Sequence, residues 1–544
     1  TPEGQLCAQL YPLATLNLLD VDTDEEGLLH PRLFVLDPDF LVDITSICQC
    51  LRESGPSPYF HLLAKFMPRE DSLALQLGNA ANQFLDDTLN TSAPFLESMQ
   101  RTFRDYPLQY CTLEGVDERF FEQCRAQHAH IRTAVAHHFR EAGIRAGQDE
   151  VQLEPSFVCD ALGIQGRMDL LTADLTKIVE LKSGKQDEFH GTFRLEHALQ
   201  MALYKEILHY GLGRARQEVK TLLLYSRYPV LHDIRLGANH IARALCLRNG
   251  IVFIERQLRT NAAAFLDALD EEAFNPTHCQ SRLYTGYVRP RIEAFLRTIH
   301  SATPLERDYF CTMTAFVARE QMLAKVGDDR ADSDRGFAQA WLCDTDNKRL
   351  HGNILTDLRL TPRRDAQGLL THVVATLPAD DTSQANFREG DSVILYERNT
   401  EADLMTNRQS MRCQVEELHA DRLLLRFSHP QRGDSGLRFD RLFAIEPAHS
   451  DALFAPLYRG LYALLTCEML VVQQRSVVHD QHDIGFRNDL TLDAVGNDDI
   501  ALGAAAALFS AVNRREGDIV AGLDDCRAED LTEIHDALAA DTGE

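Results

Sequence analysis

The chain has 544 residues and a formal net charge of -27, from 55 basic against 82 acidic residues. This balance excludes a general nucleic-acid coat protein or a binder of anionic membranes, although a local basic groove remains compatible with DNA binding. We expect no transmembrane helix, because the sequence contains no apolar run of about 18 residues. The 13 cysteines form no Cys-x-x-Cys pair, which favours reduced thiols in a cytoplasmic protein, associated with the nucleoid if bacterial.

The length is typical of two to four domains, and the pattern along the chain supports such a division. Residues 73–150 have mainly helical periodicity. Beyond them the pattern predicts strands, then a helix and a further strand, which is typical of an α/β unit. The expected strands are 151–154, 157–159, 168–172, 177–182 and 221–225, and the expected helix is 191–210.

The periodicity of apolar residues changes twice in the second half of the chain. Residues 281–348 return to helical periodicity, most clearly at 284–300 and 308–326. Residues 349–447 contain at least five short alternating runs separated by turn residues, which predicts a small β-barrel of the OB or SH3 kind. We expect residues 448–544 to form a helical, acidic C-terminal region, since the last 58 residues hold 14 acidic and 4 basic residues.

Two of the expected strands carry a constellation of charged residues. Asp169 and Glu180 would lie at adjacent strand ends, and the period of two places Glu180 and Lys182 on one face of the sheet. Leu181 would then point into the opposite apolar layer, which leaves its backbone carbonyl free to bind a cation. Two carboxylates and a carbonyl suit Mg²⁺ or Mn²⁺, and such a site can activate water against a phosphodiester. Lys182 would orient or deprotonate that water, or neutralise phosphoryl oxygens.

The helix that follows brings two further polar residues to one face. Gln200 and Tyr204 are separated by one helical turn. Gln200 could bond to DNA or to backbone near the site, and Tyr204 could do the same or stack on a base. The order Asp, Glu-x-Lys, Gln-x-x-x-Tyr is much more specific than any part of it alone.

This order resembles the PD-(D/E)XK nuclease superfamily in its RecB-like branch, over roughly residues 40–290. The resemblance implies a restriction-endonuclease-like mixed sheet flanked by helices in residues 71–280, with residues 1–70 packed on it. It implies metal binding by Asp169 and Glu180, assistance in catalysis by Lys182, and a helix carrying Gln200 and Tyr204 beside the active site.

One position departs from the family pattern. Many RecB-like nucleases carry Gly-x-x-x-His on an upstream helix, and the histidine binds the metal. The matching segment here begins at Gly78 and ends at Asn82, whose amide oxygen is a weaker ligand than imidazole. We therefore expect activity that is slower, more dependent on Mn²⁺, or lost. Glu154 is a candidate additional acidic group near the same site.

The domain order also resembles the nuclease, helical stalk and β-barrel of the flap-processing nuclease–helicase family. The helicase motor of that family has no counterpart here, since no G-x-x-x-x-G-K-[ST] loop occurs, and we expect no ATP site in this chain. A motor is expected either in cis beyond residue 544 or in trans. The family's iron–sulfur cluster needs four cysteines, and only Cys48, Cys50 and Cys279 stand near the corresponding places, so no cluster is expected.

Two functions of different classes follow from the sequence. The first is a metal-dependent deoxyribonuclease acting on single-stranded or flapped DNA within a nuclease–helicase system for repair, replication or defence. The second is a catalytically silent, nuclease-derived subunit that binds DNA or serves as a scaffold. The residues do not discriminate a DNA substrate from an RNA substrate.

Overall fold

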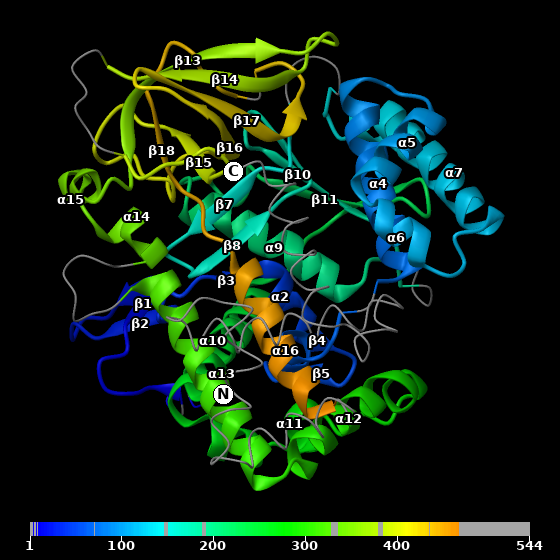
Figure 1. Ribbon diagram of the computed structural model, residues 1–544, viewed down its shortest axis with the longest axis vertical. Coiled ribbons are helices and arrows are strands. Elements are labelled where there is room, and N and C mark those ends of the chain that lie inside the picture. Colours follow the sequence, from blue (N-terminus) through cyan, green and yellow to red (C-terminus); the bar gives the residue numbers. More distant parts are fainter. Residues whose placement is uncertain are drawn as a thin grey trace, which may run out of the picture.

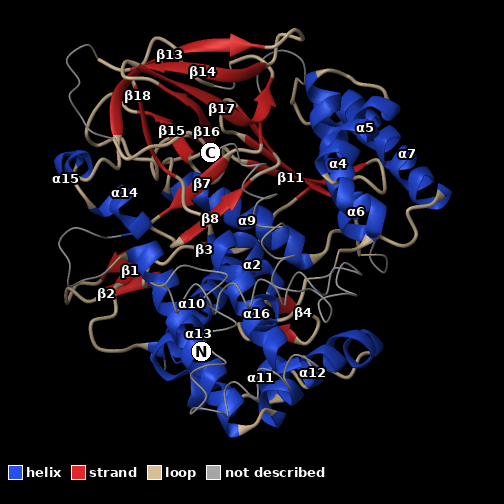
Figure 2. Cartoon of the chain, in the orientation of Figure 1, coloured by secondary structure: helices blue, strands red, loops and turns tan. Residues whose placement is uncertain are grey.

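The computed structural model describes residues 4, 7, 9–69, 71–145, 151–187, 192–327, 336–378, 385–434 and 436–466 (Figure 1). It confirms a mixed α/β protein that contains a closed β-barrel. In Figure 2 the barrel strands gather at one end of the molecule, and a group of helices occupies the opposite end. No helix in the described residues is both long enough and apolar enough to cross a bilayer.

A five-stranded sheet carries the residues that the sequence singles out. The pair β10–β11 is parallel and the other neighbouring strands are antiparallel, so the sheet is mixed. Most of these strands follow the sequence pattern closely, whereas β12 was not predicted. The strands in order across the sheet are β12 (Val230–Asp233), β11 (Lys220–Tyr225), β10 (Lys177–Lys182), β9 (Leu170–Thr172) and β6 (Val151–Leu153).

Each face of this sheet is covered by its own hydrophobic core. Ile178 belongs to one core, and its neighbour Val179 belongs to the other, as the alternation of a strand requires. The first core includes residues of α2 (Ile44–Gln49), α9 (Leu195–Tyr210) and α10 (Ala238–Asp267). The second core includes residues of α4 (Leu73–Asn90), α5 (Phe95–Asp105), and α7 (Glu118–Thr133).

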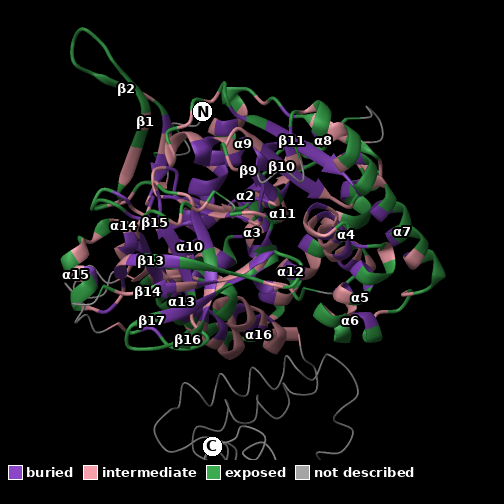
Figure 3. Ribbon diagram, turned by 90° about the horizontal axis from the view of Figure 1, so that it is seen from above, coloured by how far each residue is buried: buried purple, intermediate pink, exposed green. Residues whose placement is uncertain are grey.

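The N-terminal segment shares the core of the domain that follows it. Strand β3 (Val42–Asp43) pairs in parallel with β8 (Ile164–Arg167), which pairs with β7 (Ser156–Cys159). The antiparallel hairpin β1 (Leu16–Thr23) and β2 (Leu29–Leu36) projects from the body with an exposed tip (Figure 3). The smaller elements of this segment are β4 (Leu51–Arg52), β5 (Gly55–Pro56) and α3 (Phe60–Phe66).

Helices join this domain to the barrel. The longest of them, α13 (Pro304–Val326), begins four residues before the predicted start. Thr303 and Glu306 form a capping box, and Pro304 occupies the first turn, so the helix nucleates earlier than its apolar pattern indicates. The other helices here are α12 (Arg289–Ser301), α14 (Gln339–Leu342), and α15 (Thr345–Leu350), and α16 (Phe454–Thr466) returns from the barrel to pack on α13 and α3.

The barrel closes through six antiparallel strands around a core of aliphatic and aromatic residues. Its last strand, β18, pairs with both β13 and β15 and so closes the ring. The six strands are β13 (Leu355–Arg364), β14 (Leu370–Thr376), β15 (Ser392–Glu397), β16 (Ser410–Leu418), β17 (Arg422–Gln431) and β18 (Phe443–Pro447). Of the expected helical, acidic C-terminal region, 448–544, the structure describes residues 448–466, which include α16, and residues 467–544 lie outside the described part of the chain.

Candidate active site

Three of the predicted site residues meet on the β9–β10 hairpin. The register pairs Val179 with Leu170, so Glu180 and Asp169 follow as the next opposed positions. Lys182 Nζ donates to Glu180 Oε1 at 2.8 Å, which places these side chains on one face of β10. Leu181 points into the opposite apolar core. The strand alternation that the sequence predicts therefore brings two acids and an amine together.

The backbone of Leu181 also faces this group. Its N–H donates to Asp169 Oδ2 at 2.6 Å, whereas the Lys182 carbonyl accepts from Ser226 N at 3.0 Å on the side of β11. Because the N–H and C=O of one strand residue point to the same side, the Leu181 carbonyl is directed toward the side on which Asp169 lies. It is therefore available as a third oxygen ligand.

Helix α9 packs beside Glu180 and holds its carboxylate through a hydrogen bond. Gln200 Nε2 donates to Glu180 Oε1 at 2.7 Å and to Tyr204 Oη at 2.9 Å, and the Tyr204 hydroxyl donates to the Arg167 carbonyl. A Cβ on Gly166 would lie 2.8 Å from the Tyr204 ring, so only glycine permits this close packing. Tyr204 is 2% exposed, which leaves its ring no face for a base. These contacts make Gln200 and Tyr204 positioning residues.

The acids lie close enough to repel one another. Burial, and then the charge of Glu180, raises the pKa of Asp169 to about 8. Burial, and then the charge of Asp169, raises the pKa of Glu154 to about 9, although Arg167 Nε lies 2.5 Å from Glu154 Oε2. Such a group of buried carboxyls is short of positive charge, which is the electrostatic condition that a divalent cation relieves.

One atom of this group has no partner. Glu180 Oε2 is buried and accepts no hydrogen bond from any described residue. A buried carboxylate oxygen without a partner is costly, and a bound cation would satisfy it. The oxygens of Asp169, Glu180 and the Leu181 carbonyl therefore fit a hard divalent cation. No arrangement of three or more His, Cys, Asp or Glu side chains that could hold a metal ion is found among the described residues, so the carbonyl would have to complete the site.

Glu154 adopts an unusual backbone conformation. It follows β6 with φ 54°, in the left-handed region that non-glycine residues rarely occupy, and its N–H donates to the Asp169 carbonyl at 3.0 Å. This conformation turns its carboxyl toward the other acids. Asn82 lies on α4 and is half-buried, and within the described part of the chain no hydrogen bond links its side chain to Asp169, Glu180 or Glu154.

The sequence reasoning missed a residue on α4. Asp86 lies one turn beyond Asn82, burial raises the pKa of its carboxyl, and its charge contributes to the raised pKa of Glu154. Asp86 could have been predicted from the sequence, because its i, i+4 spacing places it on the same helix face as Asn82. The partner of Asp86 was not predictable from the sequence, because His429 reaches it from β17 of the barrel, with Nδ1 3.7 Å from Asp86 Oδ2.

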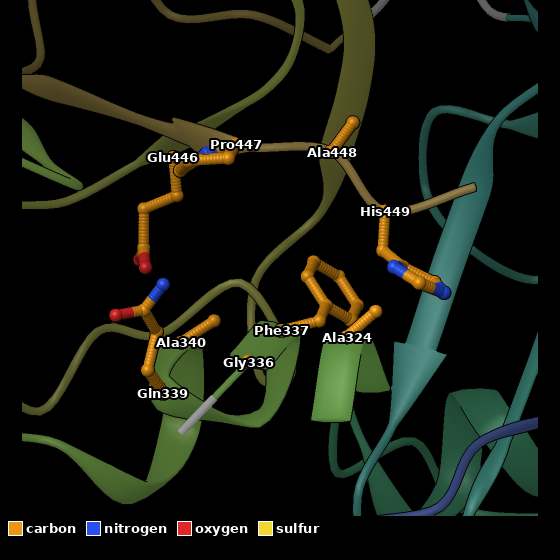
Figure 4. Close-up of a pocket in the computed structure, with 9 residues that line it drawn as sticks. All are labelled: Ala324, Gly336, Phe337, Gln339, Ala340, Glu446, Pro447, Ala448 and His449. Carbon is orange, nitrogen blue, oxygen red and sulfur yellow. The ribbon is translucent and has the colours of Figure 1, made fainter. Parts of the chain in front are cut away.

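A separate cavity of about 160 Å³ lies where the helical stalk meets the barrel. Figure 4 shows the carboxyl of Glu446 and the amide of Gln339 pointing toward one another there. Lys348 Nζ lies 3.1 Å from Glu446 Oε2, so the buried carboxylate already has a cationic partner. None of the predicted site residues lines this cavity, and it is distinct from the candidate site.

Comparison with known proteins adds no assignment to this geometry. No family model and no curated protein matches the chain.

Proposed function

We propose that the protein is a divalent-metal-dependent deoxyribonuclease with a restriction-endonuclease-like core, acting on single-stranded or flapped DNA. The observation that carries this proposal is the buried, unpartnered Glu180 Oε2 beside Asp169, with the Lys182 ammonium on the same face. A purely structural Glu–Lys pair has no need of a second acid beside it. Here the charge of Glu180 raises the pKa of Asp169, and the charge of Asp169 raises the pKa of Glu154.

Asp169, Glu180 and the Leu181 carbonyl would hold Mg²⁺ or Mn²⁺. When bound, the cation supplies charge neutralisation at the phosphodiester and activation of the attacking water. Lys182 places a second positive charge beside the phosphoryl oxygens, held by its 2.8 Å contact with Glu180. Gln200 keeps Glu180 oriented toward the site, so the chain's own contribution is preorganisation of charge.

The direct test is cleavage of labelled single-stranded DNA with Mg²⁺ or Mn²⁺ by the wild type and by Asp169→Ala, Glu180→Ala and Lys182→Ala. We expect each substitution to lower the rate by about 100-fold or more. Glu218→Ala is the matched control, since Glu218 is exposed and outside the site, and it should cleave as the wild type does. Circular dichroism would establish that each variant is folded. Activity that survives all three site substitutions would disprove the proposal.

A catalytically silent DNA-binding or scaffold subunit is the alternative. Asn82, which stands where the RecB-like pattern has a metal-binding histidine, favours it. Calorimetry with Mn²⁺ separates the two functions. Retention of DNA with no heat of Mn²⁺ binding would support the scaffold, whereas Mn²⁺ binding that Glu180→Ala abolishes would support the nuclease.

A further inference from the structure

Three arginines from distant parts of the sequence gather beside the candidate site. Arg52 lies on β4, Arg194 directly precedes α9, and Arg291 is in the first turns of α12, and all three are exposed. Their approach follows from packing of the β4–β5 hairpin, which lies against α9 on one side and against residues 273–277, ahead of α12, on the other.

The contact of this hairpin with residues 273–277 is close and specific. Thr277 Oγ1 donates to the Ser54 carbonyl at 2.9 Å, and Ser54 Oγ donates to the Phe274 carbonyl at 3.3 Å. A Cβ on Gly55, which has φ +94°, would lie 2.6 Å from the Thr277 side chain, so the position requires glycine. The β4–β5 hairpin and residues 273–277 are therefore held against each other by two hydrogen bonds and by the close approach at Gly55.

We call Arg52, Arg194 and Arg291 the arginine cluster. Nearby carboxylates neutralise only part of its positive charge. Arg52 is exposed as a whole residue, but its guanidinium lies over the Phe60 ring. Desolvation of the guanidinium first, and then repulsion from Arg291 and Arg194, lowers the pKa of Arg52 against the attraction of Glu196. Glu196 is paired with Arg194 at 2.7 Å. Among the described residues, no carboxylate lies within ion-pair distance of Arg52 or Arg291. In a chain with a net charge of -27, a local excess of guanidinium groups is suited to a polyanion.

An exposed aromatic ring accompanies the cluster. Tyr287 is 73% exposed and lies one helical turn before Arg291, so the two side chains share a face. The neighbouring Tyr284 is fully buried and donates to Glu271 Oε1 at 3.1 Å, which anchors this helix while Tyr287 remains in solvent. An exposed tyrosine beside arginines is typical of surfaces that stack unpaired bases and bind the backbone between them.

The cluster is also connected to the candidate site through β11. Tyr225 is the partner of Lys182 in the parallel register, and its Oη accepts from the Arg194 N–H at 3.0 Å. The same hydroxyl lies 2.9 Å from His197 Nδ1. Arg194 is therefore held beside the strand end that carries Lys182, which places the cluster next to the candidate site.

We propose that Arg52, Arg194, Arg291 and Tyr287 form the contact surface for the stretch of single-stranded nucleic acid next to the scissile phosphate. This inference rests on the proposed nuclease function and adds to it the segment that holds the strand. The arginines bind phosphates, and Tyr287 stacks on a base, which duplex DNA does not present.

The test is fluorescence anisotropy with a labelled oligothymidylate at several salt concentrations, in an Asp169→Ala background that prevents cleavage. We expect Arg52→Gln/Arg291→Gln to weaken binding about tenfold or more and to lower the salt slope by about 0.7 for each arginine. Tyr287→Ala should weaken binding about tenfold, and Tyr287→Phe should restore it, because stacking needs only the ring.

The matched control is Arg235→Gln. Arg235 has a side chain that is 84% exposed, and it follows Ile234, which bonds to Thr221 at the far end of β11 from Lys182. It should leave affinity and salt slope unchanged. The inference would be overturned if the affinity and the salt slope of Arg52→Gln/Arg291→Gln lay within twofold of the values for Arg235→Gln. It would also be overturned if the double variant lost as much affinity for duplex DNA as for the oligothymidylate.

The two proposals fail in different ways. A wild-type protein that binds the oligomer through these arginines but never cleaves it would contradict the nuclease function and leave the contact surface standing. Cleavage that depends on Asp169 and Glu180, with binding indifferent to the arginines, would contradict the contact surface alone.

Discussion

Gln431, at the end of barrel strand β17, pairs through its side-chain amide with the backbone of Leu153 on the edge strand of the central sheet. The Leu153 N–H donates to Oε1 at 3.0 Å, and Nε2 donates to the Leu153 carbonyl at 3.0 Å. The side-chain amide thus makes the two backbone hydrogen bonds that a neighbouring strand would make with Leu153. Because Glu154 follows Leu153, the barrel helps to hold the backbone that presents this acid.

Gln431→Ala should therefore loosen the barrel from the sheet. It leaves a buried N–H and a buried C=O without partners, and we expect a loss of about 2 kcal/mol in the free energy of unfolding. Urea unfolding measures this loss, and proteolysis in the native state reports the opening of the interface. The exposed Gln367 is the control, since Gln367→Ala removes an amide from the β13–β14 turn. Equal stability of the two variants would contradict the role given to Gln431.

Glu154→Gly should stabilise the protein while weakening its affinity for metal. Glycine relieves the left-handed conformation, which costs a non-glycine residue about 1 kcal/mol, and it removes a buried acid from a repulsive group. We expect a gain of about 1 kcal/mol in urea unfolding without metal, and a higher Kd for Mn²⁺ in calorimetry. Glu154→Gln retains the strained backbone and should gain less. A destabilised glycine variant would show that Glu154 has a structural role.

Tyr204→Phe tests the positioning role of α9. The substitution removes the hydroxyl that donates to the Arg167 carbonyl and accepts from Gln200, without changing the packing against Gly166. Glu180 should lose its fixed orientation, so we expect kcat to fall about tenfold with KM nearly unchanged. A rise in KM at constant kcat would show instead that Tyr204 contributes to substrate binding.

His197 should make stability depend on pH in a defined window. Burial first, and then the charges of Lys182 and Arg194, lowers its pKa from 6.5 to about 3. The unfolded chain therefore binds a proton that the folded chain does not, and stability is lost as pH falls from about 6.5 toward 3. The loss is about 1.4 kcal/mol for each pH unit, and His197→Gln should abolish this component. Urea unfolding of both proteins at pH 7.5 and 5.5 measures the difference. Parallel pH profiles would contradict the shift.

Much of the candidate site could be predicted from local periodicity. A strand alternates its side chains, so Glu180 and Lys182 share a face and Leu181 enters the apolar core. Residues four apart on a helix lie on the same face, so the side chains of Gln200 and Tyr204 are in contact. The barrel was likewise predictable from its alternating runs, although its closing strand β18 was not. Strands β8 and β12 were not predicted, because β8 has only one fully buried residue and β12 has none, so neither shows an alternation of apolar and polar positions.

Residues that share a face within a single strand or helix can be predicted from the amino-acid order, because those relationships depend only on the period of the backbone. The pairing of different elements depends on the tertiary packing. His429 reaches Asp86 from the barrel, Gln431 completes the edge of the sheet, and the arginine cluster assembles from three separate segments. Such contacts depend on how whole cores pack, and no local pattern records that packing.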